Sequence, residues 1–241
     1  LFTVALETLL ELEPAGGRVL DFGCGTAVWG VLLATEGARV TLVDLSPVAV
    51  EVGLRRARAS GVADRVTGLA RDASDLSCFP DGAFDLVFGN AALHHTVKYP
   101  GAVEELLRVL RPGGALVLAE TLGNNPLLNV ARRLRARLAG EAAEQGEGTV
   151  LADHDLDRLR PHLAHLEVRG LNLLAMAKRL LRGRFTSPAA RAALAALEGA
   201  DRLLLRALPH LERRCGEAVV VGERGGRLER GGDRLQWKIK D

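Results

Sequence analysis

A stretch near the N-terminus has the residue types of a ligand-binding turn. Residues 18–22 are mostly apolar and predict a short buried strand, in which Asp21 is the one acidic side chain. Gly23 and Gly25 follow at once, and a helix is expected over residues 27–36. Because glycine has no Cβ, the backbone can bend sharply here and a small molecule can lie directly against it. The positive amino end of the helix would then point at that molecule.

The charge beside this turn separates two ligand classes that use such a motif. Asp21 directly precedes the glycines, and a carboxylate there would repel the pyrophosphate of a dinucleotide. S-adenosylmethionine carries an ammonium and a sulfonium, so the same carboxylate would attract it. The third glycine of the dinucleotide fingerprint would also fall on Val28. The turn therefore favours S-adenosylmethionine, and an ordinary strand-to-helix turn is the alternative.

Composition limits the class of protein. The chain has 241 residues, 48% hydrophobic and 26% charged, which fits one sizeable globular domain. Its formal net charge of +2 gives no electrostatic argument for nucleic acid or an anionic membrane. The three cysteines are widely spaced and odd in number, which argues against a disulfide framework and a zinc site and favours a reducing cytoplasm. No apolar run is long enough to cross a bilayer, so we expect no stable membrane insertion.

The first half of the chain alternates predicted helices and strands. A first helix occupies residues 1–12, and Ser46 and Pro47 have the residue types of an N-cap and a first helical position. The predicted strands are residues 18–22, 40–43, 65–69, 84–88 and 115–119, and the further predicted helices are residues 27–36, 46–59 and 103–110. Such alternation predicts a parallel sheet covered on both faces, with ligands at the carboxyl ends of its strands.

The second half is mainly helical. Leucine, alanine and arginine patterns predict helices at residues 127–138, 153–162 and 189–215, and strands at residues 166–174 and 217–222. These strands complete a seven-stranded, mostly parallel, Rossmann-like α/β sheet. The helical stretch between them is much longer than a hairpin needs, so we interpret Ala175–Arg214 as a cap over the ligand edge. Extra helices that only thicken the core are the alternative.

The chain is therefore predicted to be one domain over residues 1–224. Its core would span residues 13–122, and the cap and last strands residues 123–224. Residues 225–241 are rich in glycine, arginine and aspartate, and we expect a flexible tail there.

Four stretches in the first half match a known family in the right order. They are Val19–Thr26, Val43–Pro47, Phe84–Phe88 and Arg108–Gly114. Together they resemble the class I S-adenosylmethionine-dependent methyltransferases, especially the type 11 small-molecule branch. The resemblance implies S-adenosylmethionine as cofactor, S-adenosylhomocysteine as product and a small molecule as methyl acceptor. The third glycine of the family's Gly-x-Gly-x-Gly pattern falls on Ala27, a small residue that should still allow close packing of the helix.

The resemblance also assigns residues to the cofactor. Asp44 ends the second strand, and its two oxygens can accept both ribose hydroxyls. Asp72 is expected to accept from the adenine amino group while Ala73 packs on the ring, and Asn90 and Ala91 would face the methionine part. Loop polarity at Asp72 and a plain turn at Asn90 are the alternatives. The predicted cofactor-binding set is Asp21, Gly23, Cys24, Gly25, Thr26, Asp44, Leu45, Asp72, Ala73, Asn90 and Ala91.

Candidate catalytic and substrate residues follow the fourth and fifth strands. His94 and His95 can act as a base or orient a nucleophile, with His95 preferred, or can be structural. Glu120 and Asn124 are predicted on the substrate side, with cap scaffolding as the alternative for Glu120. No metal is expected. Because the sulfonium is already an activated leaving group, the protein mainly has to align the acceptor, and a base is needed only when the acceptor loses a proton.

Functions of other classes compete with this one. A non-catalytic S-adenosylmethionine-binding or assembly protein is the first alternative, and the intact Asp21, Gly23, Gly25 and Asp44 favour the enzyme. Methylation of nucleic acid or protein is disfavoured by the low net charge and by the lack of an Asn-Pro-Pro-Tyr motif after the fourth strand. The accepting atom, whether oxygen, nitrogen, carbon or sulfur, and the oligomeric state are left open.

The segment Leu127–Leu138 has a second interpretation. It carries Arg132, Arg133, Arg135 and Arg137 beside its leucines. Such a helix can touch a membrane that holds a lipid-like substrate, or its arginines can simply form a solvated face.

Overall fold

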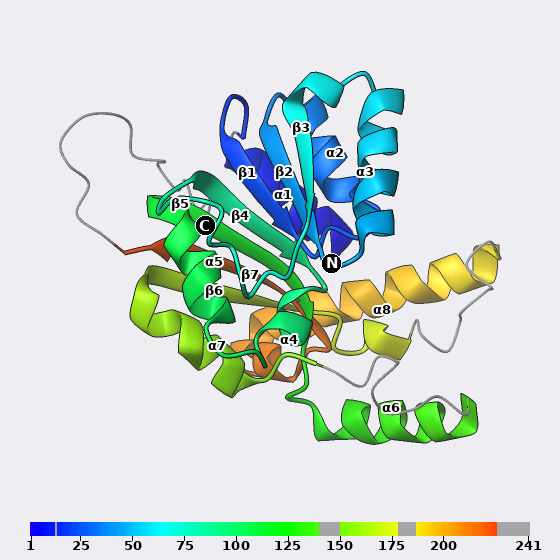
Figure 1. The fold of residues 1–241 in the computed structure, drawn as a ribbon. Helices are drawn as coiled ribbons and strands as arrows, with labels where there is room; N and C mark the ends of the chain where they lie inside the picture. The colour runs from blue at the N-terminus through cyan, green and yellow to red at the C-terminus, as the bar shows by residue number, and fades with distance from the viewer. Residues whose placement is uncertain (13, 140–149, 178–186, 226–241) are drawn as a thin grey trace.

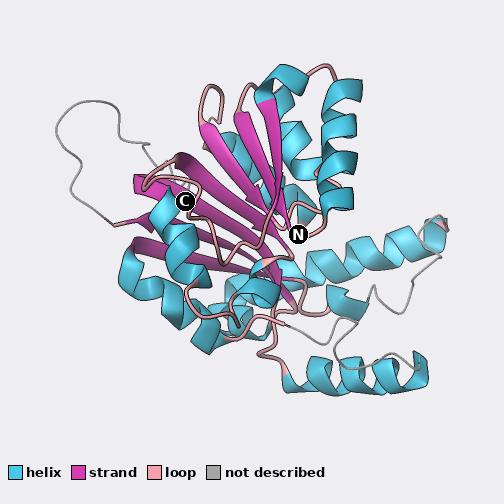
Figure 2. Ribbon diagram, in the orientation of Figure 1, coloured by secondary structure: helices cyan, strands magenta, loops and turns pink. Residues whose placement is uncertain are grey.

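Seven strands form one sheet in the order β3-β2-β1-β4-β5-β7-β6 (Figures 1 and 2). The computed structural model describes residues 1–12, 14–139, 150–177 and 187–225. β7 pairs antiparallel with both β5 and β6, and the pairs from β3 across to β5 are parallel, which confirms the predicted mostly parallel sheet. The strands are β1 (Arg18–Phe22), β2 (Arg39–Asp44), β3 (Val66–Ala70), β4 (Phe84–Asn90), β5 (Leu110–Thr121), β6 (Leu163–Leu171) and β7 (Glu217–Arg224).

Helices cover both faces of this sheet (Figure 2). The helices are α1 (Phe2–Glu11), α2 (Val28–Thr35), α3 (Pro47–Ala59), α4 (Leu93–Thr96), α5 (Ala102–Val109), α6 (Pro126–Ala139), α7 (Asp153–Leu159) and α8 (Pro188–Ala207). Side chains of α1, α2 and α3 join one apolar layer, and those of α4, α5 and α7 join the other. α6 and α8 extend from the end of the sheet at which β1, β2 and β4 finish (Figure 1).

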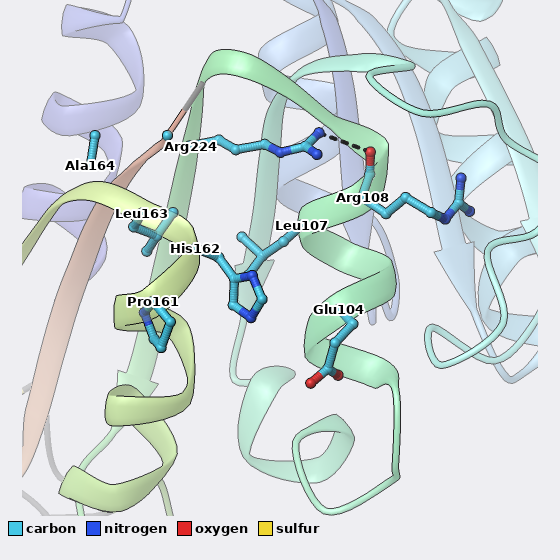
Figure 3. A pocket seen from close by; sticks show the side chains of 9 residues that line it. Glu104, Leu107, Arg108, Pro161, His162, Leu163, Ala164 and Arg224 are labelled. Atoms are coloured by element: carbon cyan, nitrogen blue, oxygen red, sulfur yellow. Dashed lines mark hydrogen bonds between the residues drawn. The ribbon is translucent and has the colours of Figure 1, made fainter. Parts of the chain in front are cut away.

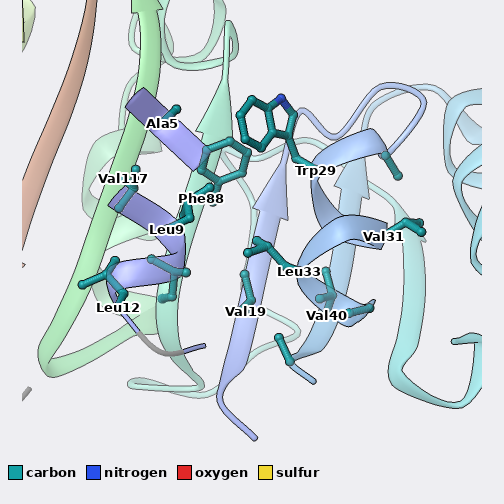
Figure 4. Close-up of a cluster of buried hydrophobic side chains, with 14 of the residues drawn as sticks. Ala5, Leu9, Leu12, Val19, Trp29, Val31, Leu33, Val40, Phe88 and Val117 are labelled. Atoms are coloured by element: carbon teal, nitrogen blue, oxygen red, sulfur yellow. The ribbon is translucent and has the colours of Figure 1, made fainter. Parts of the chain in front are cut away.

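Successive residues of the central strands alternate between the two apolar layers, as the pleat of a strand requires. Val19 and Phe88 belong to the layer beneath α1 and α2, whereas Leu20 and Val87 belong to the opposite layer. Figure 4 shows the first layer, in which the rings of Trp29 and Phe88 pack with centroids 5.2 Å apart. Because both faces are closed by apolar side chains, a ligand can reach the sheet only along an edge formed by strand ends.

The start of α3 agrees with the sequence prediction. The Oγ atom of Ser46 accepts a hydrogen bond of 3.2 Å from the N–H of Ala49, and Pro47 occupies the first turn. The N-cap satisfies a backbone donor that has no partner inside the helix. It also fixes the direction in which the chain leaves β2, directly after Asp44.

β5 begins earlier than the predicted strand at residues 115–119. It starts at Leu110 and includes the Pro-Gly-Gly segment that the sequence suggested would precede it. The pairing with β4 is irregular beside Asp85, and a Cβ on Gly114 would lie only 2.9 Å from the carbonyl oxygen of Asp85. A glycine at this point therefore lets β5 pass close to β4 while the register shifts.

The chain between β6 and β7 contains α8, within the predicted cap Ala175–Arg214. Asp201 of α8 is buried, and its two oxygens accept the N–H groups of Leu174 at 2.7 Å and Ala175 at 3.0 Å. This carboxylate fastens α8 to the chain leaving β6. Residues 178–186 of the predicted cap and residues 226–241 of the predicted tail lie outside the described residues.

Candidate active site

The carboxyl ends of β1, β2, β4 and β5 bring most of the predicted site residues to one edge of the sheet. The loop after β1 joins the end of β2 through the N–H of Cys24, which donates to the carbonyl of Val43 at 3.1 Å. The loop after β4 joins the end of β5 through the N–H of Ala91, which donates to the carbonyl of Ala119 at 2.8 Å. These backbone bonds hold the two loops in fixed positions above adjacent strands.

The glycine turn leaves space beside its backbone. Gly23 and Gly25 have left-handed φ angles of 59° and 51°, which glycine adopts without strain. A Cβ on Gly23 would lie 2.6 Å from the Cβ of Ala92, so the loop after β4 packs directly on this glycine. A Cβ on Gly25 would meet no atom within 4 Å. Gly25 therefore presents bare backbone to an open space, as close contact with a ligand requires.

Ala27 holds the position at which the family pattern has its third glycine. It is also left-handed, with a φ of 55°, and its methyl group is 1% exposed. A Cβ on Gly53 of α3 would lie 2.7 Å from that methyl group. Because Gly53 has no side chain, α3 leaves room for the methyl group of Ala27 in the turn. The helices α2 and α3 can therefore still pack closely.

Asp44 connects the glycine turn to the start of α3. Its Oδ2 accepts the N–H of Gly25 at 2.8 Å, and its Oδ1 accepts the N–H of Ser46 at 2.8 Å. Each carboxylate oxygen has a second lone pair, so both can accept a further hydrogen bond. The next residue, Leu45, is 74% exposed. The two oxygens of Asp44 can accept hydrogen bonds from the polar ribose of a nucleoside, and the exposed side chain of Leu45 can pack on its flat base.

Asp21 lies beneath the turn rather than in the open space. It is 2% exposed, and its Oδ2 accepts the N–H of Gly30 at 3.0 Å. Because the N-cap residue Ala27 has no side-chain acceptor, Asp21 satisfies this donor in the first turn of α2. Burial raises the pKa of Asp21 to about 7, the Gly30 bond opposes that rise, and the charge of Asp44 adds to it. The carboxylate thus changes its charge near neutral pH, next to the proposed ligand position.

The other predicted residues of the turn, Cys24 and Thr26, differ in their exposure. Cys24 is half-buried, and its burial raises the pKa of the thiol, which stays protonated at neutral pH. Thr26 is exposed, and its carbonyl accepts from Nε of Arg56 at 3.0 Å. Arg56 is a contact that sequence reasoning missed, because an arginine on an exposed helix carries no local signal of its partner.

Two further loops complete this edge. After β3, Asp72 is half-buried, and its Oδ1 accepts the N–H and the hydroxyl of Ser74 at 2.9 Å and 2.8 Å, while Ala73 packs against an apolar layer. Ser74 was not predicted. After β4, Asn90 is half-buried and Ala91 is exposed with a left-handed φ of 52°. These residues lie at the ends of strands that flank β1 and β2, in agreement with their predicted place.

Glu120 and His94 form a buried pair at the end of β5. Oε1 of Glu120 accepts the N–H groups of Ala92 at 3.0 Å and Leu93 at 2.7 Å, and its Oε2 lies 2.6 Å from Nδ1 of His94. Glu120 is 0% exposed. Its carboxylate therefore caps the short helix α4, which the sequence did not predict, instead of reaching an open cavity.

His95 lies at the surface of α4, beside this pair. Its ring centroid is 4.1 Å from that of His94, and its side chain is exposed. Partial burial lowers the pKa of His95, as do the neighbouring His94 and Lys98, while Glu120 opposes the shift. The imidazole of His95 is therefore neutral at pH 7 and can accept a proton.

Asn124 connects β5 to the helical region. Its Nδ2 donates to Oδ1 of Asp153 at 2.7 Å, and its carbonyl accepts from Nη1 of Arg214 at 2.7 Å. It also lines a hollow between α7, β6 and the chain before β7, together with apolar side chains such as Leu156 and Val168. This hollow is continuous with the end of β5 rather than with the glycine turn.

A second hollow lies at the opposite edge of the sheet (Figure 3). Glu104, Arg108, His162 and Arg224 line it, and Arg224 donates to the carbonyl of Arg108 at 3.0 Å. β7 ends here, next to the amino end of β5, so this hollow is remote from Gly25 and Asp44. Among the described residues no group of three or more histidines, cysteines or carboxylates could hold a metal ion.

The sheet order and the glycine turn are those of the class I S-adenosylmethionine-dependent methyltransferase fold. Residues 19–114 match a family model described as a methyltransferase domain. This match confirms the resemblance to a methyltransferase domain over these residues, and the sheet order confirms the predicted fold class.

Similar proteins support the same class. The chain is 42% identical over 106 residues to a demethylmenaquinone methyltransferase of Clavibacter sepedonicus, covering 44% of this chain and 42% of that protein. It is 36% identical over 162 residues to the 27-O-demethylrifamycin SV methyltransferase of Amycolatopsis mediterranei (strain S699), covering 67% and 57%. The chain thus spans about half the length of the curated relatives it matches.

A solved structure shares the fold at lower identity. The phosphoethanolamine N-methyltransferase 2 of Haemonchus contortus, in complex with S-adenosylmethionine, is similar with a TM-score of 0.62 at 20% identity. The match covers 94% of this chain and 53% of that chain.

Proposed function

We propose that this protein transfers a methyl group from S-adenosylmethionine to a small-molecule acceptor. The observation that carries the proposal is the cradle formed by Gly25 and Asp44, in which bare backbone is hydrogen-bonded to a carboxylate that keeps free lone pairs. When bound, S-adenosylmethionine supplies a methyl group on a sulfonium, which is an activated leaving group. The residues of the protein therefore have to hold the cofactor and align the acceptor with its methyl group.

Each residue of the cradle has a distinct binding role in this proposal. Asp44 accepts from the ribose hydroxyls while it keeps its bonds to Gly25 and Ser46. Asp72 accepts from the adenine amino group with the oxygen that Ser74 leaves free, and Leu45 and Ala73 cover the ring. The remaining residues Cys24, Thr26, Asn90 and Ala91 line the methionine part with backbone and small side chains.

His95 is the proposed base when the acceptor is a hydroxyl. Its exposed, neutral imidazole can take the proton that the oxygen loses during methyl transfer. His94 and Glu120 hold α4 in place, so they act as positioning residues for His95. For an acceptor that loses no proton, alignment alone would suffice, because positioning removes much of the entropic barrier.

The acceptor class is proposed from the relatives and from the cap. The names of the two curated relatives refer to demethylmenaquinone and to 27-O-demethylrifamycin SV, both small molecules. The segment Ala175–Arg214, fastened through Asp201, is proposed to select among such acceptors. Three free cysteines favour the cytoplasm as the site of action, and nucleic acid is not proposed as a partner.

The proposal is tested with methyl-labelled S-adenosylmethionine. The purified protein is incubated with a cell extract, and mass spectrometry searches for a labelled small molecule. We expect a labelled product with the native chain, and less of it with Asp44→Asn when the cofactor concentration is below saturation. Cofactor binding without any labelled product would instead support a non-catalytic binding protein, and absence of both would exclude the proposal.

A further inference from the structure

The exposed face of α6 is an apolar stripe. Leu127, Val130 and Leu134 are 80%, 55% and 56% exposed, and their spacing of three and four residues places them on one side of the helix. The helix extends away from the sheet in Figure 1. A helix on the surface of a globular protein normally turns such a stripe inward, to the core.

The opposite side of α6 is attached to the protein through polar groups. Nδ2 of Asn129 donates to the carbonyl of Gly123 at 2.6 Å, and Nη1 of Arg132 donates to the carbonyl of Leu122 at 2.9 Å. Nη2 of Arg132 also reaches the carbonyl of Gly216 at 3.4 Å. The helix is therefore inverted, since its polar side is bound to the protein and its apolar side faces outward.

The charge of α6 indicates what covers the stripe. The helix contains four arginines and no acidic residue, although the whole chain has a formal net charge of only +2. Arg133 and Arg137 are exposed, and each follows a stripe residue by three positions, so both flank the stripe. An arginine beside an apolar surface can place its stem on that surface and its guanidinium against phosphate.

We propose that α6 docks on the surface of an anionic lipid bilayer. Leu127, Val130 and Leu134 would enter the boundary between headgroups and acyl chains, and Arg133 and Arg137 would contact lipid phosphates. The helix would lie on the membrane, because none of the helices within the described ranges is long and apolar enough to span it. Pairing of α6 with α6 of a second copy would bring arginines against arginines, which disfavours that occupant.

Co-sedimentation with vesicles tests this docking without cofactor or acceptor, so its result is independent of the proposed methyl transfer. The full chain is mixed with vesicles of phosphatidylglycerol and phosphatidylcholine in equal parts, and with vesicles of phosphatidylcholine alone. We expect binding to the mixed vesicles, at least about 10-fold weaker binding to phosphatidylcholine, and release by high salt.

Two pairs of variants locate the contact. Val130→Gln/Leu134→Gln should abolish binding to the mixed vesicles, and Arg133→Gln/Arg137→Gln should weaken it about 10-fold or more. Arg55→Gln/Arg58→Gln in α3 removes the same charge from another exposed helix and should leave binding unchanged. Circular dichroism checks that the variants fold.

Three results would overturn the proposal. The native chain could fail to bind the mixed vesicles, or both α6 variants could bind them as well as the native chain. The third is a dimer in analytical ultracentrifugation that Val130→Gln/Leu134→Gln dissociates, which would make the stripe a self-association surface.

Discussion

Oε2 of Glu120 lies 2.6 Å from Nδ1 of His94, and the two side chains are 0% and 8% exposed. At this distance the two atoms share one hydrogen bond. The other oxygen of Glu120 holds two backbone N–H groups at the start of α4. One buried carboxylate thus fixes both the loop after β4 and the histidine next to the proposed base.

Glu120→Ala should lower the free energy of unfolding by about 3 kcal/mol or more, because it leaves His94 and two backbone donors buried without an acceptor. Glu120→Gln keeps one acceptor oxygen and should cost clearly less. Urea denaturation measures both. Glu104→Ala, at a glutamate with 55% of its side chain exposed, is the control and should change stability by less than about 0.5 kcal/mol. Equal losses for Glu120→Ala and the control would show that the pair has no structural role.

Gly53→Ala should destabilise the protein by about 1–3 kcal/mol through overpacking. The new methyl group would lie 2.7 Å from Cβ of Ala27 and 2.9 Å from Cδ1 of Leu42. In an Ala27→Gly background the same change should cost less by at least about 0.5 kcal/mol, since one clash is gone. Gly199→Ala in α8 meets only a flexible arginine at 3.8 Å and should not destabilise. Strict additivity of Gly53→Ala and Ala27→Gly in thermal unfolding would refute the compensation.

Affinity for S-adenosylmethionine should increase as pH rises toward and through about 7. Burial raises the pKa of Asp21 to about 7, and the cationic ligand favours the ionised carboxylate. Calorimetric titration can measure this affinity from about pH 6 to about 7.5. In this range the amino group of the ligand stays mostly protonated, so its own titration contributes little. Asp21→Asn should remove this dependence, and a native affinity that is constant over the range would contradict it.

The same shift has a consequence for stability. The pKa of Asp21 in the folded protein lies above the unfolded value of 3.8, so ionisation is disfavoured by folding. Asp21 should therefore reduce stability progressively as pH rises from about 4 to about 7. In thermal unfolding, Asp21→Asn should lack this loss of stability with rising pH. An identical dependence of stability on pH in the variant and the native protein would refute the raised pKa of Asp21.

His95→Ala should lower kcat about 10²-fold with a hydroxyl acceptor while cofactor affinity stays nearly unchanged. Since its environment lowers the pKa of His95, turnover of the native enzyme should rise with pH through a midpoint below the usual histidine range. His154→Ala, at a side chain that is 81% exposed, is the control and should keep full turnover. Full turnover by His95→Ala at neutral pH would exclude base catalysis.

Local patterns were sufficient to predict most of the fold. The strands β1, β2 and β4 are short and mostly apolar, and Ser46 with Pro47 marks the start of α3. Each of these elements can therefore be recognised from a few neighbouring residues. The glycine turn was equally visible, because Gly23 and Gly25 lie directly after a strand.

Features that depend on distant partners could not be predicted. α4 has four residues and no periodicity, and its first N–H group is satisfied by Glu120, 27 positions further along the chain. The capping of α2 by Asp21 likewise requires β1 and α2 to pack first. The leucines and arginines of residues 127–138 suggested contact with a membrane. The outward direction of the stripe on α6 could not be predicted, because a helical pattern does not show which side of the helix faces the protein.

The central claim, that Asp44 and the glycine turn bind S-adenosylmethionine, is tested most directly by calorimetric titration of the cofactor into the purified chain. We predict saturable binding at one site that Asp44→Asn weakens by at least about 1 kcal/mol, or about fivefold, because the ribose loses a charged acceptor. Asp64→Asn, at an exposed aspartate before β3, should bind as the native chain does. An absence of binding, or the same affinity in Asp44→Asn as in the native chain, would contradict the account.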